Sequence, residues 1–273
     1  MIIIKSPEDI AKMRVAGRSA RAICEALAAR VSPGITTKAL DDEAGELMRR
    51  QGVRSAFLGY RGYPGTVCIS VNEEVVHGIP GSRRIAVGDI VGIDVGVLVN
   101  GFHGDTALTV MVGVTDPDVI RLVEVTKQAL QAGIAQAHVG RRLSDVSHAI
   151  EKTAATAGFA VVRDFVGHGI GRRMHEEPQI PNYGPPGRGP KLLAGMTLAI
   201  EPMVNLGCAE VNMLDDGWTV VTRDRRPSAH FEHTVVVGET TAEVLTESGA
   251  EKSLDHATSG MIYKQVLMPS ESI

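Results

Sequence analysis

Five acidic or histidine side chains of this chain lie in segments that are otherwise apolar or rich in glycine. Asp94 lies in IVGIDVGVLV (90–99) and Asp105 in FHGDTALTVMV (102–112), while His168, Glu201 and Glu232 lie in GHGIG, TLAIEPMV and HFEHTVVV. An ionised carboxylate in a buried strand is costly unless it is paired or bound to a metal. Four carboxylates and one imidazole are enough to hold two divalent ions that share bridging carboxylates. The sequence therefore predicts a buried metal centre.

The composition narrows the class of protein and its partners. With 273 residues, 44% of them hydrophobic, the chain is long enough for one large domain or two small ones. A net charge of −4 does not indicate nucleic acid or an anionic membrane as a main partner. Three cysteines without a CxxC pair, and an N-terminus unlike a signal peptide, predict a cytoplasmic protein with reduced thiols. No apolar run approaches the ~18–20 residues of a membrane span.

Two pairs of helices are predicted, one pair in each half of the chain. Ser6-Pro7-Glu8-Asp9 is typical of a helix start, and apolar residues at helical spacing follow it until Pro33-Gly34. A second helix covers 37–51 and ends at Gly52. In the second half, Asp116-Pro117 starts a helix that runs to about residue 137, and Ser144 caps another that ends at Gly158.

Strands are predicted after each pair of helices. They cover 66–71, 90–99 and 102–112, and then 159–166, 197–204, 218–222 and 229–237, with an irregular loop at 181–190. Because each half has two helices followed by strands that carry acids, the pattern predicts a pseudo-symmetric α+β domain. We expect residues 1–249 to form this one domain and residues 250–273 to form a mobile or surface-lying tail.

Asn100-Gly101 sets the relation between the first two acids, because this dipeptide is the strongest short hairpin signal. If it forms a two-residue loop, Gly96 faces Asp105. Asp94 and Asp105 are then diagonal neighbours on one face, roughly 7–8 Å apart at the backbone, and both can reach ions between them. A slip of one residue would place them on opposite faces. The alternative is two acids near a turn, one of them solvated, but the apolar neighbours of Asp94 favour a buried site.

Taken singly, the other candidates have ordinary explanations. GHGIG could form a tight turn or a phosphate loop, although no Lys-Ser or Lys-Thr follows it, which excludes a P-loop. Glu201 could simply end a strand before Pro202, and Glu232 could be a paired surface acid. All five positions together favour the metal centre.

Longer segments of the chain resemble a known enzyme family. They are FLGYRGYPGTVCISVNEEVVHGIPG (57–81), IDVGVLVNGFHGDT (93–106), GHGIGRRMHEEPQIPNYG (167–184), TLAIEPMV (197–204), DGWTVVTRD (216–224) and SAHFEHTVVV (228–237). Together they are similar to the type I methionine aminopeptidases, from about residue 6 to about residue 246. Related prolidases share the five ligands but not the run through His77 or GWTVVT. The resemblance implies the pita-bread (creatinase/aminopeptidase) fold, with pseudo-twofold symmetry and a central antiparallel sheet covered by helices.

The resemblance also implies a role for each candidate residue. Two divalent ions (Co, Mn, Fe or Zn) would be held by Asp94, Asp105, His168, Glu201 and Glu232, with Asp105 and Glu232 bridging. His77, His175 and Glu201 would be catalytic, and the methionine pocket would be formed by Tyr60, Tyr63, Cys68, His77, Met174, His175 and Trp218. Asn72, Glu74 and Ser228 match a monovalent-cation site for Na or K. Phe57 and Met174 depart from the family pattern, which has a small or sulfur residue and an aromatic residue there.

The function implied by the resemblance is removal of the initiator methionine from nascent polypeptides that have a small second residue. The expected enzyme is cytoplasmic, monomeric and associated with the ribosome, and it binds no specific nucleic acid and no membrane. The alternatives are a non-catalytic binding protein on the same fold, a Xaa-Pro peptidase, and a metal-free creatinase-like hydrolase. The five intact ligand positions disfavour the first and the third. A Xaa-Pro peptidase is expected to need a further N-terminal domain, for which this sequence leaves no room.

Overall fold

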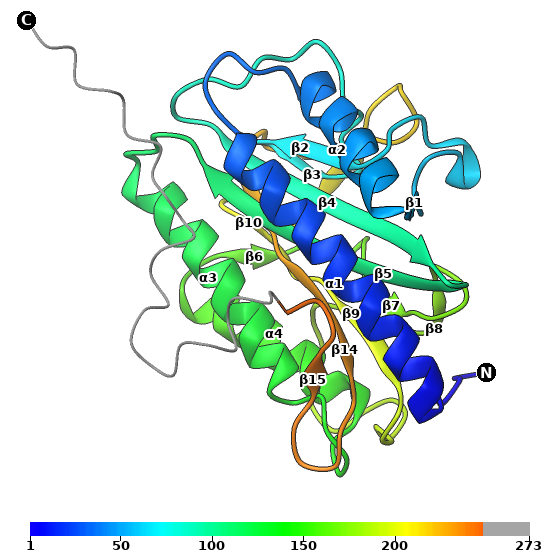
Figure 1. Cartoon of the computed structure of the whole chain (residues 1–273). Helices are drawn as coiled ribbons and strands as arrows, with labels where there is room; N and C mark the ends of the chain where they lie inside the picture. Colours follow the sequence, from blue (N-terminus) through cyan, green and yellow to red (C-terminus); the bar gives the residue numbers. More distant parts are fainter. Residues whose placement is uncertain (248–273) are drawn as a thin grey trace, which may run out of the picture.

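The structure is a computed structural model that describes residues 1–247 (Figure 1). The expected tail at 250–273 lies outside the described residues. Each half of the described chain supplies two helices. These are α1 (Pro7–Arg30) and α2 (Thr37–Gln51) in the first half, and α3 (Pro117–Ile134) and α4 (Leu143–Thr156) in the second. None of the helices in residues 1–247 has the length and apolar character that a membrane span requires.

The observed helix ends can be compared with the start and stop signals in the sequence. The Ser6 side chain accepts the N–H of Asp9 at the start of α1, and Gly52 takes a left-handed conformation (φ 67°) after α2, both as predicted. Helix α3 ends at Ile134, before the predicted end near residue 137. The prediction that Ser144 caps α4 is wrong.

The N-cap of helix α4 lies two residues before the residue that the sequence indicated. Arg142 occupies the N-cap position, and the Asp145 side chain accepts its backbone N–H at 2.7 Å. The Ser144 hydroxyl instead accepts the N–H of Arg188 at 2.7 Å, so it holds the irregular 181–190 loop against the helix. A serine in the first turn can therefore serve a neighbouring loop rather than its own helix.

The central sheet is antiparallel in every strand pair and has the order β1-β4-β5-β14-β9-β7-β8, with β2 on β4 and β15 on β14. Its strands are β1 (Arg54–Ser55), β2 (Cys68–Val71), β4 (Ile90–Val99), β5 (Phe102–Met111), β7 (Gly167–Gly169), β8 (Glu176–Ile180), β9 (Thr197–Ile200), β14 (Glu232–Val236) and β15 (Glu243–Val244). Two smaller sheets have the orders β13-β10-β6 and β11-β12-β3. Their strands are β3 (Glu74–Val76), β6 (Ala160–Val161), β10 (Met203–Asn205), β11 (Val211–Met213), β12 (Val220–Thr222) and β13 (Ser228–His230).

The hairpin of β4 and β5 has the predicted register. Asn100 and Gly101 both have positive φ (51° and 79°), and Gly96 pairs with Asp105. The later strands are shorter than predicted. The run 197–204 divides into β9 and β10 at Glu201-Pro202, because proline has no N–H for the ladder. The run 229–237 divides at Phe231, where the chain passes from the small sheet of β13 into the central sheet. Of 159–166 only β6 is extended, and 218–222 is a strand only from Val220.

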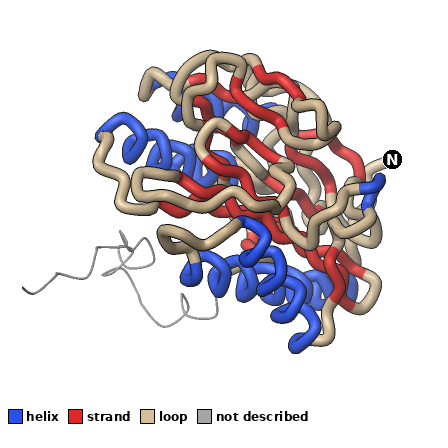
Figure 2. The backbone as a smooth tube through the Cα atoms, turned by 90° about the horizontal axis from the view of Figure 1, so that it is seen from above, coloured by secondary structure: helices blue, strands red, loops and turns tan. Residues whose placement is uncertain are grey.

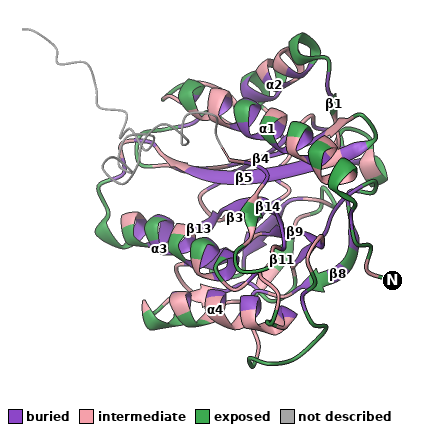
Figure 3. Ribbon diagram, turned by 60° about the horizontal axis from the view of Figure 1, so that its bottom comes forward, coloured by how far each residue is buried: buried purple, intermediate pink, exposed green. Residues whose placement is uncertain are grey.

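Helices cover the sheet on its outer side. Helix α1 packs on β4 and β5, while α3 packs on α4 and contacts β9, β13 and β14. Figure 2 shows the strands gathered in the middle with the helices along the periphery, and Figure 3 shows β5 buried beneath α1. Gly104 allows the close approach of α1, since a Cβ there would lie 2.5 Å from the backbone of Ala16. Side chains from both halves share one core, including Leu27, Ile93 and Leu130.

Strands β5 and β14 are neighbours at the middle of the sheet, and each belongs to a different half of the chain. Buried threonine hydroxyls join the backbones at this junction. Thr106 donates to the carbonyl of Glu232 and Thr234 to the carbonyl of Asp105, both at 2.8 Å. Thr109 donates at the same distance to the carbonyl of His230. The order β4-β5-β14-β9 thus places the acid-bearing strands of the two halves side by side (Figure 1).

Candidate active site

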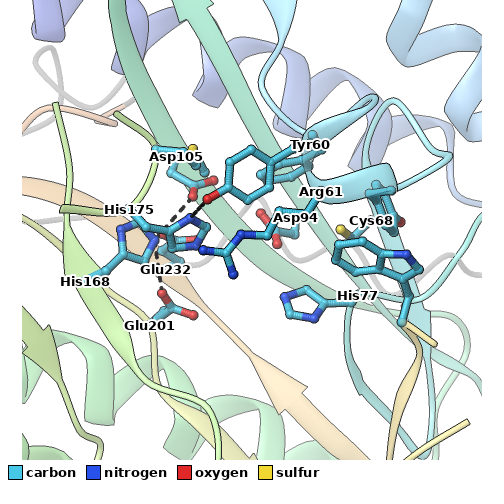
Figure 4. A pocket seen from close by; sticks show the side chains of 14 residues that line it. Tyr60, Arg61, Cys68, His77, Asp94, Asp105, His168, His175, Glu201 and Glu232 are labelled. Atoms are coloured by element: carbon cyan, nitrogen blue, oxygen red, sulfur yellow. Dashed lines mark hydrogen bonds and ion pairs between the residues drawn. The ribbon is translucent and has the colours of Figure 1, made fainter. Parts of the chain in front are cut away.

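A cavity with an empty volume of about 670 Å³, including the part open to solvent, lies over the middle of the sheet. Its lining contains the five predicted metal ligands and all residues predicted to be catalytic or to contact methionine (Figure 4). The lining residues are Phe57, Tyr60, Arg61, Tyr63, Cys68, His77, Asp94, Asp105, His168, Met174, His175, Glu201, Trp218 and Glu232.

The strand register places the acids on one face of the sheet. Asp94 pairs with Ala107 across β4 and β5, and Ala107 pairs with Glu232 across β5 and β14. Because directly opposite residues point to the same face, Asp94 and Glu232 share a face with Asp105, two residues before Ala107. Glu201 follows the last residue of β9. The diagonal arrangement predicted for Asp94 and Asp105 is thus the observed one.

His168 points toward the acids from β7. Its Nε2 lies 3.5 Å from Oε1 of Glu201 and 3.8 Å from Oδ2 of Asp105. Ligand atoms of Asp105, His168 and Glu232 all lie within 4.8 Å of one another. Nδ1 of His168 lies 2.9 Å from the carbonyl oxygen of Gly169, which accepts the Nδ1 proton. The Nε2 lone pair of His168 is thereby left facing the carboxylates. This is the orientation that a metal-binding imidazole needs.

The electrostatics of the acids fit a divalent cation. Burial raises the pKa of Asp94 to about 7, and burial followed by repulsion among the acids raises the pKa values of Asp105, Glu201 and Glu232 well above the usual range. Buried oxygens of three of these side chains, Oδ1 of Asp94, Oδ1 of Asp105 and Oε1 of Glu232, have no hydrogen-bond partner among the described residues. A cation among them would supply the missing partner and compensate the charge, and mixed oxygen and imidazole donors suit Mn, Fe, Co or Zn.

His175 is held by an aromatic hydroxyl from a distant segment. Oη of Tyr60 lies 2.8 Å from Nδ1 of His175, and the two rings stack with centroids 5.4 Å apart. When the hydroxyl donates to Nδ1, Nε2 carries the proton and can donate into the cavity. Burial, together with the charges of Arg61 and His103, lowers the pKa of His175, so the neutral donor form predominates near pH 7.

The other end of the cavity is aromatic and contains a cysteine thiol. The Tyr63 ring meets the Trp218 ring edge-on at 5.1 Å, and its hydroxyl donates to the carbonyl of Gly78 at 2.9 Å. Burial raises the pKa of the Cys68 thiol well above its usual value, so the group stays an uncharged wall. His77 lies 6.1 Å from Trp218 between ring centroids, and burial lowers its pKa to about 4. This end can therefore take an apolar side chain.

The two departures from the family pattern both line the cavity. Met174 is 3% exposed. The Phe57 ring lies over Gly96 of β4, where an added Cβ would come within 2.5 Å of Cε1 of the ring. The absence of a side chain at Gly96 is what leaves room for phenylalanine at this wall.

Two residues of the site were missed in the sequence. Arg61 lines the cavity beside Tyr60. His230 is 5% exposed, its Nε2 has no hydrogen-bond partner among the described residues, and this atom lies 4.0 Å from Oε2 of Glu201. Burial lowers the pKa of His230 to about 3. One sequence signal was available for each, since Arg61 separates two predicted pocket residues and His230 precedes Glu232 by two positions.

The expected monovalent-cation residues are not part of the cavity lining. The backbone N–H of Ser228 donates to the carbonyl of Asn72 at 2.9 Å. The Glu74 carboxylate accepts the N–H of Val71 and the guanidinium of Arg83, both at 2.8 Å. Carbonyl groups rather than the Glu74 carboxylate would therefore provide most of a cation site here.

Comparison with known proteins places this arrangement among metal-dependent peptidases. Residues 11–239 match the model of metallopeptidase family M24. The chain belongs to this family. Methionine aminopeptidase 1 of Bacillus subtilis is 50% identical over 246 residues, which cover 90% of this chain and 99% of that protein. The methionine aminopeptidase of Clostridium perfringens is also 50% identical, with the same coverage. Family membership and the acid cluster together support the use of divalent metal.

Solved structures of the M24 family share the fold. A methionine aminopeptidase from Thermotoga maritima is 47% identical and superposes with a TM-score of 0.89, covering 91% of this chain and 100% of that one. The prolidase of Pyrococcus horikoshii is only 21% identical and has a TM-score of 0.73, with 91% of this chain and 64% of that one covered, so it shows the fold alone. The expected pita-bread fold of mixed helices and antiparallel sheet is confirmed.

Proposed function

We propose that this protein is a metal-dependent methionine aminopeptidase that removes the N-terminal methionine from polypeptides with a small second residue. One observation carries the proposal. A single cavity combines a buried set of four carboxylates and one imidazole with neutral histidine donors and an apolar end. The high identity to methionine aminopeptidases over nearly their whole length supports the same activity.

The proposed metal ligands are the five residues named from the sequence. Asp94, Asp105, His168, Glu201 and Glu232 would hold two divalent ions, and the family resemblance implies that both ions would share Asp105 and Glu232, which lie on the adjacent strands β5 and β14. When bound, divalent cations lower the pKa of a water molecule and polarise a carbonyl oxygen. We further propose a monovalent cation, Na or K, near the carbonyl of Asn72.

Glu201 is the proposed general base. Its carboxylate is 14% exposed, lies beside His168, and sits at the end of β9 where Pro202 interrupts the strand. Asn182 fixes the backbone there, because its amide donates to the carbonyl of Glu201 at 3.1 Å. From this position the carboxylate can accept a proton from the attacking water and pass it to the leaving amine.

His175 and His77 are the proposed donors to the reacting amide. His175 presents its Nε2 proton to the cavity while Tyr60 holds the other ring nitrogen. A donor preorganised in this way stabilises the oxyanion that develops in the transition state, which is often the largest catalytic contribution. His77 lines the cavity at the aromatic end and has a lowered pKa, so it also acts as a neutral hydrogen-bonding group.

The apolar end of the cavity is the proposed pocket for the methionine side chain. The walls combine Tyr63, Cys68, Met174 and Trp218 with the stacked Tyr60. A thioether gains about 0.3–1.5 kcal/mol from contact with aromatic rings beyond its burial. A β-branched side chain would place a methyl group against these walls, and a misplaced methylene costs about 1–3 kcal/mol.

Other properties inferred from the resemblance are also proposals. Residues 1–249 would act as one catalytic domain, which is supported by the core that both halves share. The enzyme would be a cytoplasmic monomer that meets nascent chains at the ribosome. A Xaa-Pro peptidase activity is not favoured, because the prolidase likeness extends to the fold alone.

The test is hydrolysis of amidated tetrapeptides by the purified protein after loading with Mn, Fe, Co or Zn. Met-Ala-Ser-Gly amide should be cleaved, norleucine in place of methionine should be cleaved more slowly, and leucine or valine should lose about 10–200-fold in kcat/KM. Cleavage of an Ala-Pro peptide in preference to the methionine peptide would reject the proposal. Leucine cleaved as fast as methionine would reject the pocket assignment while leaving the metal centre in place.

A further inference from the structure

Arg61 carries the permanent positive charge of the cavity lining. It is the only lysine or arginine among the described residues that line the cavity. Its side chain reaches from the Tyr60 loop across the cavity toward His175 (Figure 4). The family resemblance implies no role for it, and in the site its charge helps to lower the pKa of His175.

The backbone of the loop fixes where this arginine starts. Arg61 lies within the 3₁₀ turn η1 (Tyr60–Gly62) and has a left-handed backbone (φ 50°), which is uncommon for a residue with a Cβ. Gly59 donates its N–H to the carbonyl of Tyr63 at 2.8 Å, and Tyr63 donates to the carbonyl of Tyr60 at 2.9 Å. The loop is therefore closed on itself, with Arg61 at its tip.

The guanidinium has no acidic partner at the tip. Its Cζ lies 5.4 Å from the centroid of the Tyr60 ring. Among residues 1–247 no carboxylate lies within ion-pair distance of it, whereas Arg83 and Arg172 each meet an acid. Its five N–H donors are thus available to a group that enters from outside.

The path of the substrate indicates which group could contact the Arg61 guanidinium. The proposed function places the methionine side chain at the aromatic end and the scissile amide over the acids, so the rest of the polypeptide leaves through the open side of the cavity. Arg61 is an exposed residue at that side. The first side chains that can meet it are those beyond the small second residue.

We propose that Arg61 makes the enzyme select polypeptides by charge, favouring aspartate or glutamate at the third and fourth positions and disfavouring lysine or arginine there. This inference rests on the proposed function, whose substrate class it narrows. The planar guanidinium matches a carboxylate in a two-pronged contact. A substrate lysine in the same place meets a like charge.

The preference should appear in KM more than in kcat. The proposed contact is with substrate side chains beyond the scissile amide, and a contact made equally in the ground state and the transition state changes KM alone. A contact between an exposed guanidinium and a main-chain carbonyl of the substrate is the alternative, and it would give no dependence on substrate charge. Added salt distinguishes these two kinds of contact further, because it screens exposed charges and so weakens a preference that depends on substrate charge.

The experiment compares three amidated peptides on the metal-loaded enzyme, Met-Ala-Asp-Gly, Met-Ala-Ser-Gly and Met-Ala-Lys-Gly. We expect kcat/KM to be about three- to tenfold higher for the aspartate peptide than for the lysine peptide at low salt. Arg61→Gln should abolish this ratio and Arg61→Glu should reverse it, each ratio being measured between the aspartate and lysine peptides on the same variant, so that any general change in activity cancels. Arg225→Gln is the matched control, since Arg225 is also an exposed arginine with positive φ (60°) but lies outside the cavity.

The outcomes distinguish this inference from the proposed function. If no methionine peptide is cleaved, the proposed function fails and Arg61 has no substrate to select. If the serine peptide is cleaved but the three peptides have equal kcat/KM, or if Arg61→Gln retains the wild-type ratio, the charge selection is refuted while the aminopeptidase stands. An effect confined to kcat would also contradict it.

Discussion

Replacing Lys5 by methionine should destabilise the protein by about 3–5 kcal/mol, the usual cost of removing one partner of a buried ion pair. Nζ of Lys5 lies 2.5 Å from Oε2 of Glu176, and the two side chains are only 4% and 1% exposed. Methionine keeps the length and loses the charge. The Glu176 carboxylate is then left buried with the backbone N–H of Arg173, at 3.2 Å, as its hydrogen bond among the described residues.

A double-mutant cycle isolates the pair from other effects of the substitution. Glu176→Gln alone should also be strongly destabilising, whereas the double variant should be less destabilised than the sum, with a coupling of about 2–3 kcal/mol. Urea unfolding of all variants in the presence of a chelator measures this without a contribution from bound metal. Lys12→Met is the control, because Lys12 pairs with Glu8 at 38% and 79% exposure and its loss should cost at most about 0.5 kcal/mol.

The same pair should influence catalysis, because Glu176 directly follows His175 in the chain. We expect Lys5→Met to lower kcat by about tenfold with little change in KM, measured at a temperature where every variant is folded. A loss of stability below about 1 kcal/mol, or additive effects in the cycle, would show that the buried charge is not what Lys5 compensates.

Four other changes test separate parts of the site. Asp94→Ala should retain one bound ion by metal analysis, and an unchanged stoichiometry of two would overturn the ligand assignment. His175→Ala should lower kcat by about 10²–10³, as for other single oxyanion donors, and wild-type turnover would return it to a structural role. Burial, with Arg21 and Lys127 nearby, lowers the pKa of His233 to about 3, so the unfolded chain takes up this proton first as the pH falls below about 6.5. The stabilising effect of the neutral, buried His233 is therefore complete above that pH, and between pH 7 and 5 the free energy of unfolding of the wild type should fall by about 2 kcal/mol more than that of His233→Gln, measured by urea unfolding. Gly96→Ala should push the Phe57 ring into the cavity and raise KM for methionine peptides. Adding Phe57→Ala to this variant should restore the wild-type KM. An unchanged KM in Gly96→Ala alone would show that the ring can move without entering the cavity.

Local signals in the sequence predicted those parts of the fold that depend on near neighbours. Ser6 and Gly52 act through hydrogen bonds and backbone conformation within a few residues, so α1 begins and α2 ends where the sequence placed them. Asn100-Gly101 fixed the hairpin register and with it the relative placement of Asp94 and Asp105. The prediction for Ser144 failed because its partner, Arg188, lies in a loop that only the folded chain brings near.

The parts of the site that were missed depend on long-range packing. Arg61 and His230 belong to the site because separate segments converge on the cavity, and no periodicity marks either residue. The contact between Tyr60 and His175 spans 115 positions of sequence. The placement of these two residues in one site was inferred from a family resemblance, and the hydrogen bond between them was not foreseen at all.

The Thr234 hydroxyl links strand β14 to the backbone of Asp105 in strand β5. Thr234 accepts the N–H of Asp105 at 3.2 Å and returns its own proton to the carbonyl of the same residue at 2.8 Å. A hydroxyl thus stands in for a direct backbone contact at this position, next to the direct pairing of Glu232 with Ala107 and His233 with Thr106. The connection between the two halves of the chain at Asp105 therefore depends on one side chain that is not itself a proposed metal ligand. Serine would keep the span and lose a methyl group, whereas valine would keep the shape and leave both backbone groups of Asp105 without a partner.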